Sequence, residues 1–375
     1  MGRVILFLML AGMGVQAQAA TRVSVAQAEE ILRLAQGLPD GKAAEKIAGL
    51  AMTERVSSAR LGRWEAEFKG EQSRVALFAV ADASAFLDLP VEEIPALVKP
   101  EAAARRAILV SAVGYVNTTI HKLPNFSALR TTTHFDNVPA SQREYKKYFR
   151  EQRSGYLGTA VVKMAPPAEA EPLRVGDWSS TVVAYRDGHE EVDARAGKAA
   201  APVAGLTTSG EFGPILSIVV GDALKGEMFW DHWEHGESGV MAAFRYAVAK
   251  EQSHYTVVGA DGKARFPAYH GQIAVDPKDG TILRVTLVSE LDAPERAETA
   301  ILVEYGPVTI GGSTYTCPVR GVAFSQVPNA VAEEYYGVAD GKAQGAQVTI
   351  PPETFVNDVS FTEYHVFKAD VRVVP

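Results

Sequence analysis

A dense group of potential metal ligands lies between Asp231 and Glu237, in the sequence Asp-His-Trp-Glu-His-Gly-Glu. Asp231, His232 and His235 carry carboxylate and imidazole groups, which are common ligands of zinc. The segment lies between two expected strands, where His232 and His235 point to opposite faces unless a bulge intervenes. The spacing also differs from the His-Glu-x-x-His motif of zinc proteases. We interpret the segment as a polar turn, with a metal site at Asp231, His232 and His235 as the alternative.

The sequence lacks the local motifs of the common nucleophilic enzymes. It contains no Gly-x-Ser-x-Gly elbow and no Ser-x-x-Lys, so acyl transfer built on those motifs is disfavoured. The segment Gly37–Lys42 is similar to a phosphate loop but lacks its spacing and its Ser or Thr. A triad assembled in space has no fixed sequence order. We predict no catalytic residue and no cofactor.

Aromatic side chains are the remaining candidates for a binding site. Trp230, Trp233, Phe244 and Tyr246 fall in two segments that are expected to pair as strands. Rings of this size on one face of a sheet either fill a core against helices or line a cavity for an apolar ligand. Core filling is the commoner case. The second interpretation predicts these four residues as the binding site for a lipid or other apolar ligand.

The elements that carry these side chains change type along the chain. From Ser24 to Leu123 the apolar residues recur mainly with helical spacing. We expect a helix capped by Ser24, a second helix from Lys42 to about Met52, and a longer one from Glu101 to Lys122. Residues 20–123 are therefore predicted to form a helical N-terminal region.

From Leu129 onward polar and apolar residues alternate, as they do in strands. Strands are expected at 129–135, 239–248, 269–276, 281–291, 300–305, 315–324 and 361–373. Short Asp-Gly turns such as Asp276–Gly280 imply antiparallel neighbours. The stretches 166–177, 187–213 and 327–352 are expected to be long loops. The predicted fold class is α+β: the helical region, followed at 124–375 by a large, curved, half-barrel-like antiparallel β-sheet.

Residues 1–19 have the features of a secretory signal peptide. Arg3 precedes an apolar run from Val4 to Met13, and Ala17-Gln18-Ala19 fits the cleavage site. The run is far shorter than the roughly 20 apolar residues that cross a bilayer. We expect cleavage near Ala19 or Ala20, a periplasmic or secreted protein, and no transmembrane segment.

Composition narrows the classes of partner. The 375 residues carry a formal net charge of −8, with 47% hydrophobic and 22% charged residues. Because binding of phosphate backbones needs a basic surface, a mildly acidic chain without a Lys/Arg run argues against nucleic acid as a partner. Cys317 is the single cysteine, so no internal disulfide can form, and its alternating surroundings predict a buried strand residue.

Three segments carry a resemblance to known proteins: Leu50-Ala-Met-Thr-Glu-Arg55 with Ser57 and Trp64, then Leu123-Pro-Asn-Phe126, and finally Trp230 to Pro277 with its Trp-Asp-His-Trp-Glu and Tyr-His-Gly-Gln-Ile-Ala-Val-Asp-Pro sequences. They resemble an uncharacterised family of exported bacterial proteins over most of the mature chain, which implies no known activity. The helix-plus-curved-sheet plan is also similar to that of the periplasmic lipoprotein-carrier half-barrels. That similarity implies an apolar concavity that shelters acyl chains.

These observations predict an exported, non-enzymatic binding or carrier protein for an apolar or amphipathic ligand in the cell envelope. One alternative is a secreted hydrolase or metal-dependent enzyme that uses the cluster around His232. The other is an envelope scaffold whose exposed sheet edge or long loops bind a protein that the sequence does not identify.

Overall fold

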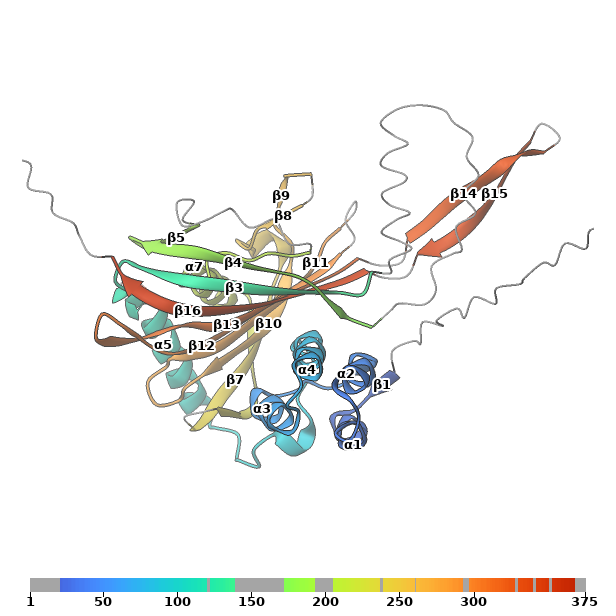
Figure 1. Cartoon of the computed structure of the whole chain (residues 1–375). Helices are drawn as coiled ribbons and strands as arrows, with labels where there is room; N and C mark the ends of the chain where they lie inside the picture. The colour runs from blue at the N-terminus through green and yellow to red at the C-terminus, as the bar shows by residue number, and fades with distance from the viewer. Residues whose placement is uncertain are drawn as a thin grey trace, which may run out of the picture.

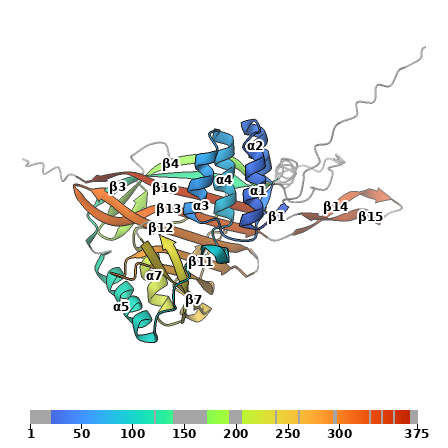
Figure 2. The ribbon, with the colours of Figure 1, turned by 90° about the horizontal axis from the view of Figure 1, so that it is seen from below.

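The computed structural model describes residues 21–119, 122–138, 172–192, 205–236, 239–259, 261–292, 297–327, 330–339, 342–350 and 353–367. These residues form one large antiparallel sheet with helices on both of its faces (Figures 1 and 2). The predicted α+β class, with helices near the N-terminus and a large antiparallel sheet after them, is confirmed. The signal peptide predicted at residues 1–19 lies outside the described residues.

Four helices form a separate cluster at the start of the described chain. They are α1 (Val25–Ala35), α2 (Asp40–Ala48), α3 (Ser58–Glu67) and α4 (Glu71–Ala83). Ser24 caps α1 as predicted: its hydroxyl accepts from the backbone N–H of Gln27, whose side chain accepts from the backbone N–H of Ser24. Leu32, Ile47, Trp64 and Leu77 are buried at the centre of this cluster.

The second helix is shorter than the sequence predicts. It ends at Ala48, and Leu50–Met52 forms strand β2, which pairs in parallel with β1 (Thr21–Val23). Because Thr21 also donates its N–H to the carbonyl of Gly49, the backbone of this segment bonds to a distant strand in place of a further helical turn. Tertiary pairing overrides helical spacing here.

Ten strands make up the main sheet, in the order β5-β4-β3-β16-β13-β12-β11-β10-β7-β6. Their bounds are β3 Phe126–Asp136, β4 Arg174–Arg186, β5 His189–Val192, β6 Glu227–Gly236, β7 Gly239–Val248, β10 Tyr269–Val275, β11 Ile282–Glu290, β12 Glu298–Ile310, β13 Ser313–Val327 and β16 Glu353–Val366. The short pieces outside the sheet are η1 (Val91–Glu93), η3 (Lys250–Gln252), β8 (Val257–Val258) and β9 (Ala264–Arg265).

Strand β16 joins two groups of strands that follow one another in sequence. Strands β6, β7, β10, β11, β12 and β13 pair in chain order, as do β3, β4 and β5, and β16 lies between β13 and β3. The predicted turn at Asp276–Gly280 connects β10 to β11. Gly280 has φ +82°, and a Cβ there would lie 2.3 Å from the carbonyl carbon of Ser111, so this turn lies directly against a helix.

All three stretches expected to be loops contain strand residues. β14 (Ala330–Ala339) and β15 (Lys342–Ile350) pair as a hairpin within 327–352, and β5 lies within 187–213. The Asp340-Gly341 dipeptide, which lies between β14 and β15 in the sequence, is a hairpin signal. Small and polar residues on both sides of it obscured the apolar alternation. The last strand also begins earlier than expected, at Glu353, and β4 begins at Arg174, inside 166–177.

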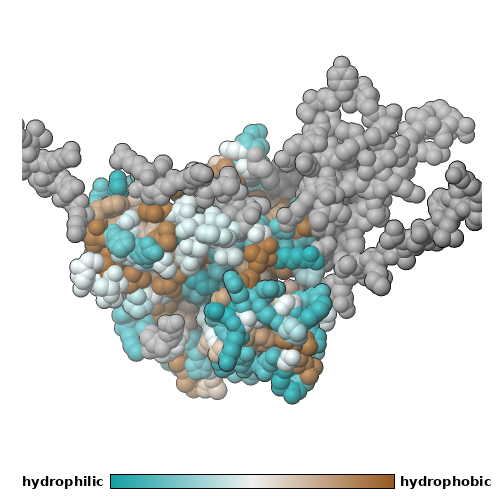
Figure 3. All heavy atoms as spheres, viewed as in Figure 1, coloured by the Kyte–Doolittle hydropathy of each residue, from teal (hydrophilic) through white to brown (hydrophobic). Residues whose placement is uncertain are grey.

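The two faces of the sheet are covered differently (Figures 1 and 2). Helices α5 (Ala102–Thr119) and α7 (Pro214–Ala223) pack on one face over a large apolar cluster. On the other face α4 packs Ala79 against Leu302 and Val322. Hydrophilic residues dominate the surface over α1 to α4 in Figure 3.

The face under α4 carries charged side chains that pair across strands. Arg284 of β11, Glu304 of β12 and Arg320 of β13 are successive cross-strand neighbours. Asp82 of α4 is fully buried and hydrogen-bonds Arg320, which also lies 3.3 Å from Glu304. These contacts attach the N-terminal helices to the sheet.

A second ionic contact joins the same two layers. Glu234 of β6 accepts from Arg284 at 2.6 Å and from Arg55, in the turn before α3, at 2.8 Å. All three side chains are buried. Burial alone would raise the pKa of Glu234, but Arg284 lowers it well below its usual range, with His232 and Arg55 contributing.

We predict that Glu234→Gln destabilises the protein by about 3–5 kcal/mol, because it leaves two guanidinium groups buried without a carboxylate. Urea unfolding measures the change. Glu290→Gln, an exposed position near the end of β11, is the control and should change the free energy of unfolding by less than about 0.5 kcal/mol. Equal stability of the two variants would contradict this account of the interface.

Asp82 makes the attachment of α4 dependent on pH. Burial, with Asp358 nearby, raises the pKa of Asp82 to about 8. The unfolded chain loses this proton near pH 4, whereas the folded protein keeps it up to about pH 8. The folded state therefore binds more protons between these values, and its stability falls as the pH rises.

We predict that the free energy of unfolding decreases from pH 5 to pH 8, by at most about 1.4 kcal/mol per pH unit for this one proton. Asp82→Asn should reduce that slope, since the amide does not titrate. Urea titrations at several pH values test this, with Glu71→Gln, on the exposed start of the same helix, as the control. A slope unchanged by Asp82→Asn would refute the assignment.

Candidate functional site

The β6–β7 hairpin brings the predicted aromatic residues together. Trp230 and Phe244 are direct cross-strand partners with ring centroids 5.4 Å apart, and the Trp230 and Trp233 rings are 4.9 Å apart. The register shifts by one residue between Trp230 and Trp233. Because this bulge adds a residue to β6, both tryptophans lie on the face that also carries Phe244.

Phe244 and Tyr246 are 1% and 2% exposed and belong to the apolar core under α5 and α7. The Tyr246 hydroxyl donates to the carbonyl of Thr286 at 2.6 Å. Trp230 and Trp233 are half-buried at the margin of this core, and the Trp233 indole donates to the carbonyl of Val98 at 2.9 Å. The four predicted residues thus form one end of a continuous apolar layer.

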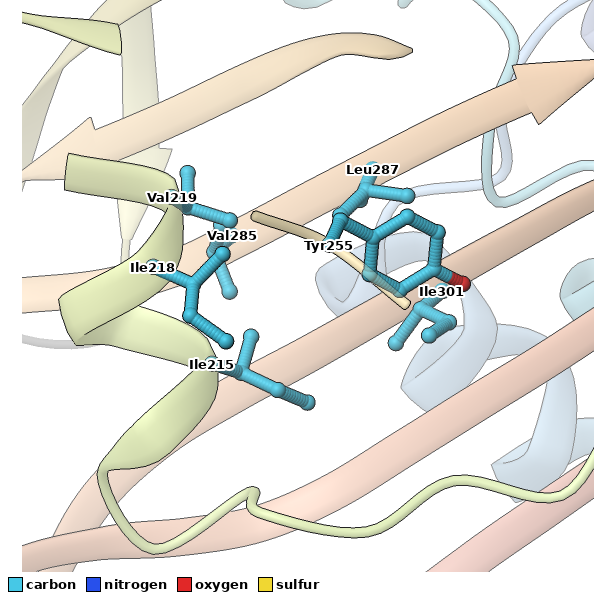
Figure 4. A pocket seen from close by; sticks show the side chains of 7 residues that line it. All are labelled: Ile215, Ile218, Val219, Tyr255, Val285, Leu287 and Ile301. Carbon is cyan, nitrogen blue, oxygen red and sulfur yellow. The ribbon is translucent and has the colours of Figure 1, made fainter. Parts of the chain in front are cut away.

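A small cavity lies in the same layer, between α7 and the sheet (Figure 4). Its volume is about 20 Å³, and it is lined by Ile215, Ile218, Val219, Tyr255, Val285, Leu287 and Ile301. This is about the space that one water molecule needs. Since no polar atom lines it, we expect it to be dry.

The helix over this cavity is almost entirely apolar. Its sequence is Pro-Ile-Leu-Ser-Ile-Val-Val-Gly-Asp-Ala, with Pro214 at its first turn, where a missing N–H costs nothing. Gly210, four residues before the helix, has φ +88°, in the region that favours glycine. The segment just before α7 therefore contains a glycine in a backbone conformation that other residues rarely adopt.

A buried carboxylate holds the other end of α7. Asp222 accepts from the Tyr269 hydroxyl at 2.8 Å, from the backbone N–H of His254 at 2.8 Å and from its Nδ1 at 2.5 Å. The His254 side chain itself is 65% exposed. Three donors satisfy this carboxylate, which fixes the helix end to β10 and to the segment after β7.

The structure places the alternative metal ligands within strand β6, where a turn had been predicted. Asp231 and His232 lie at the bulge, and His235 is exposed further along the strand. The His232 ring lies 3.2 Å from Asp231 and 3.6 Å from Glu234, and although burial opposes it, these carboxylates raise the pKa of His232. Among the described residues, no three His, Cys, Asp or Glu side chains group closely enough to hold a metal ion.

Sequence reasoning did not single out the buried charges that the tertiary structure brings together. Glu190 of β5 and Glu211, just before α7, approach each other from opposite sides of an expected loop. Arg130 of β3 lies 3.5 Å from Glu211. Glu211 is an isolated charge in Gly-Glu-Phe, whereas the adjacent pair Glu190-Glu191 was interpreted as part of a solvated loop.

Two further properties of the chain concern membrane crossing and similarity to known proteins. No helix in the described part of the chain combines the length and apolarity that crossing a bilayer requires. No family model matches this chain, and neither does any curated protein or solved structure.

Proposed function

We propose that this protein is a non-enzymatic binding or carrier protein for an apolar or amphipathic ligand in the cell envelope, and that the ligand binds between α7 and the sheet. One observation carries the proposal: the wholly apolar cavity under α7 continues into the apolar layer that holds Phe244 and Tyr246. Apolar lining with few polar groups is typical of sites for such ligands. The predicted signal peptide supports the envelope as the location.

Ligand binding in this layer requires α7 to move. Ligand pockets usually enclose about 300–1,000 Å³, whereas the cavity holds about 20 Å³. The ligand would replace the contacts that Ile215, Ile218 and Val219 now make with the sheet. An acyl chain can do this at little cost, since apolar contacts are not directional.

Helix α7 is better suited to such movement than α4 on the opposite face. It has only ten residues, and its contacts inside the cavity are aliphatic. By comparison, α4 is attached by the buried Asp82–Arg320 pair. Separation of α4 would break the buried contact between Asp82 and Arg320. A movement of α7 that keeps Asp222 bonded at its end exposes an apolar surface that a ligand can cover.

We predict that protein purified from its native envelope compartment carries a lipid, detectable by native mass spectrometry, and that the delipidated protein binds a fluorescent long-chain fatty acid. Ile218→Phe should weaken binding roughly tenfold, about 1.4 kcal/mol. The larger side chain fills the cavity and stabilises the closed form that excludes ligand.

Leu224→Phe is the matched control, because Leu224 is exposed at the end of the same helix. This variant should bind the fatty acid with the affinity of the unaltered protein. A lipid-free mass, together with no fatty-acid binding by the folded protein, would remove the proposed function. Equal fatty-acid affinity of the Ile218→Phe and Leu224→Phe variants would show that the ligand does not bind under α7.

A further inference from the structure

The segment from Gly205 to Gly213 leads into α7, and its Phe212 belongs to a second apolar cluster of the sheet. Phe212 inserts between Phe126 and Phe361, with ring centroids 5.1 Å from each. Glu211 beside it is fully buried, and its carbonyl accepts from the Tyr305 hydroxyl at 3.0 Å. Movement of α7 requires this segment to move as well.

Two carboxylates converge on this segment. Glu190 accepts from the backbone N–H of Gly210 at 3.0 Å and from that of Phe212. Glu211, between those two residues, accepts from the Thr208 hydroxyl. The other Glu211 oxygen, Oε2, has no hydrogen-bond partner among the described residues.

Among the described residues, one cation, Arg130, faces the two carboxylates. Arg130 donates to the carbonyl of Thr208 at 2.8 Å and lies 3.5 Å from Glu211. Of the residues that the structure describes, Tyr305 and Tyr364 also face these carboxylates, and Tyr115 and Cys317 lie near Tyr305. Burial raises the pKa of each of them, so they are neutral at pH 7. With both carboxylates ionised, the described part of the cluster would carry one more negative than positive charge.

We propose that the carboxyl pair of Glu190 and Glu211, while it holds one proton, forms a latch that keeps the Gly205–Gly213 segment, and with it α7, on the sheet. Loss of the proton releases the segment and opens the apolar layer. The link to ligand entry rests on the function proposed above. The latch itself is a property of the protein without ligand.

The direction of the pH dependence follows from the charges. Burial, together with Glu211, raises the pKa of Glu190 to about 8. In the open state Glu190 would be solvated, with a pKa near 4.3. The closed state binds the proton more tightly, so the open population rises with pH between these values, by at most about tenfold per unit. Acid closes the latch, and alkali opens it.

Hydrogen exchange of the ligand-free protein, corrected for the intrinsic pH dependence of exchange, tests the latch. In the unaltered protein, the opening equilibrium of residues 205–223 should rise on the order of 10- to 100-fold between pH 6 and pH 9. Glu190→Gln should remove most of this rise, because the amide keeps its acceptor oxygen but never ionises. Glu191→Gln, the exposed neighbour on β5, should keep it.

Cys317 gives a second readout, because the single thiol is buried in the same aromatic cluster as Phe212. Its rate of modification by a disulfide reagent, divided by the rate for unfolded protein at the same pH, should rise with pH in the unaltered protein and stay flat in Glu190→Gln. If Glu190→Gln does not fold, Glu211→Gln serves in its place.

Identical pH profiles for the unaltered protein and the folded glutamine variant would overturn the latch, whatever the protein binds. A pH-dependent opening without any fatty-acid binding would keep the latch and remove the proposed function. Fatty-acid affinity that rises from pH 6 to pH 9, only while Glu190 is present, would support both.

Discussion

A sheet of ten strands has two faces to cover, and alternation along each strand fixes what each face can bury. In β11, Val285 and Leu287 face α7, while Arg284 between apolar neighbours faces the N-terminal helices. The first face is covered mainly by apolar partners, with Asp222 of α7 bonded to Tyr269. The second needs counter-charges, because a buried guanidinium without a carboxylate is costly. The two helical layers therefore bind the same sheet through different interactions.

This difference determines which part of the molecule can move. The hydrogen bonds that Arg320 makes to Asp82 and that Arg55 and Arg284 make to Glu234 are directional, so they favour one position of the N-terminal helices on the sheet. The aliphatic contacts of α7 can be exchanged for those of another apolar surface. Among the described residues, a buried carboxyl group lies near a half-buried one on both faces, Asp82 near Asp358 and Glu211 near Glu190. Both layers are consequently linked to proton binding.

The aromatic residues of the candidate site could be predicted from the sequence, but the charged contacts next to them could not. Trp230, Trp233, Phe244 and Tyr246 were singled out as large rings on paired strands, and the structure places them on one face. That arrangement depends on a bulge in β6, which strict alternation does not anticipate. The segment around His232 was predicted to be a turn, but it is part of a strand. Its acidic side chains pair with Arg55, Arg245 and Arg284, which are distant in sequence.

The sequence alone determined the α+β class, the cap at Ser24, the turn at Asp276–Gly280 and most strands from β3 to β13, because local spacing and turn chemistry specify them. Tertiary structure alone decided the position of β16 between β3 and β13, the pairing of β1 with β2, and the meeting of Glu190 with Glu211. These contacts join residues far apart in the chain. Their energies come from burial and charge pairing, which no local pattern records.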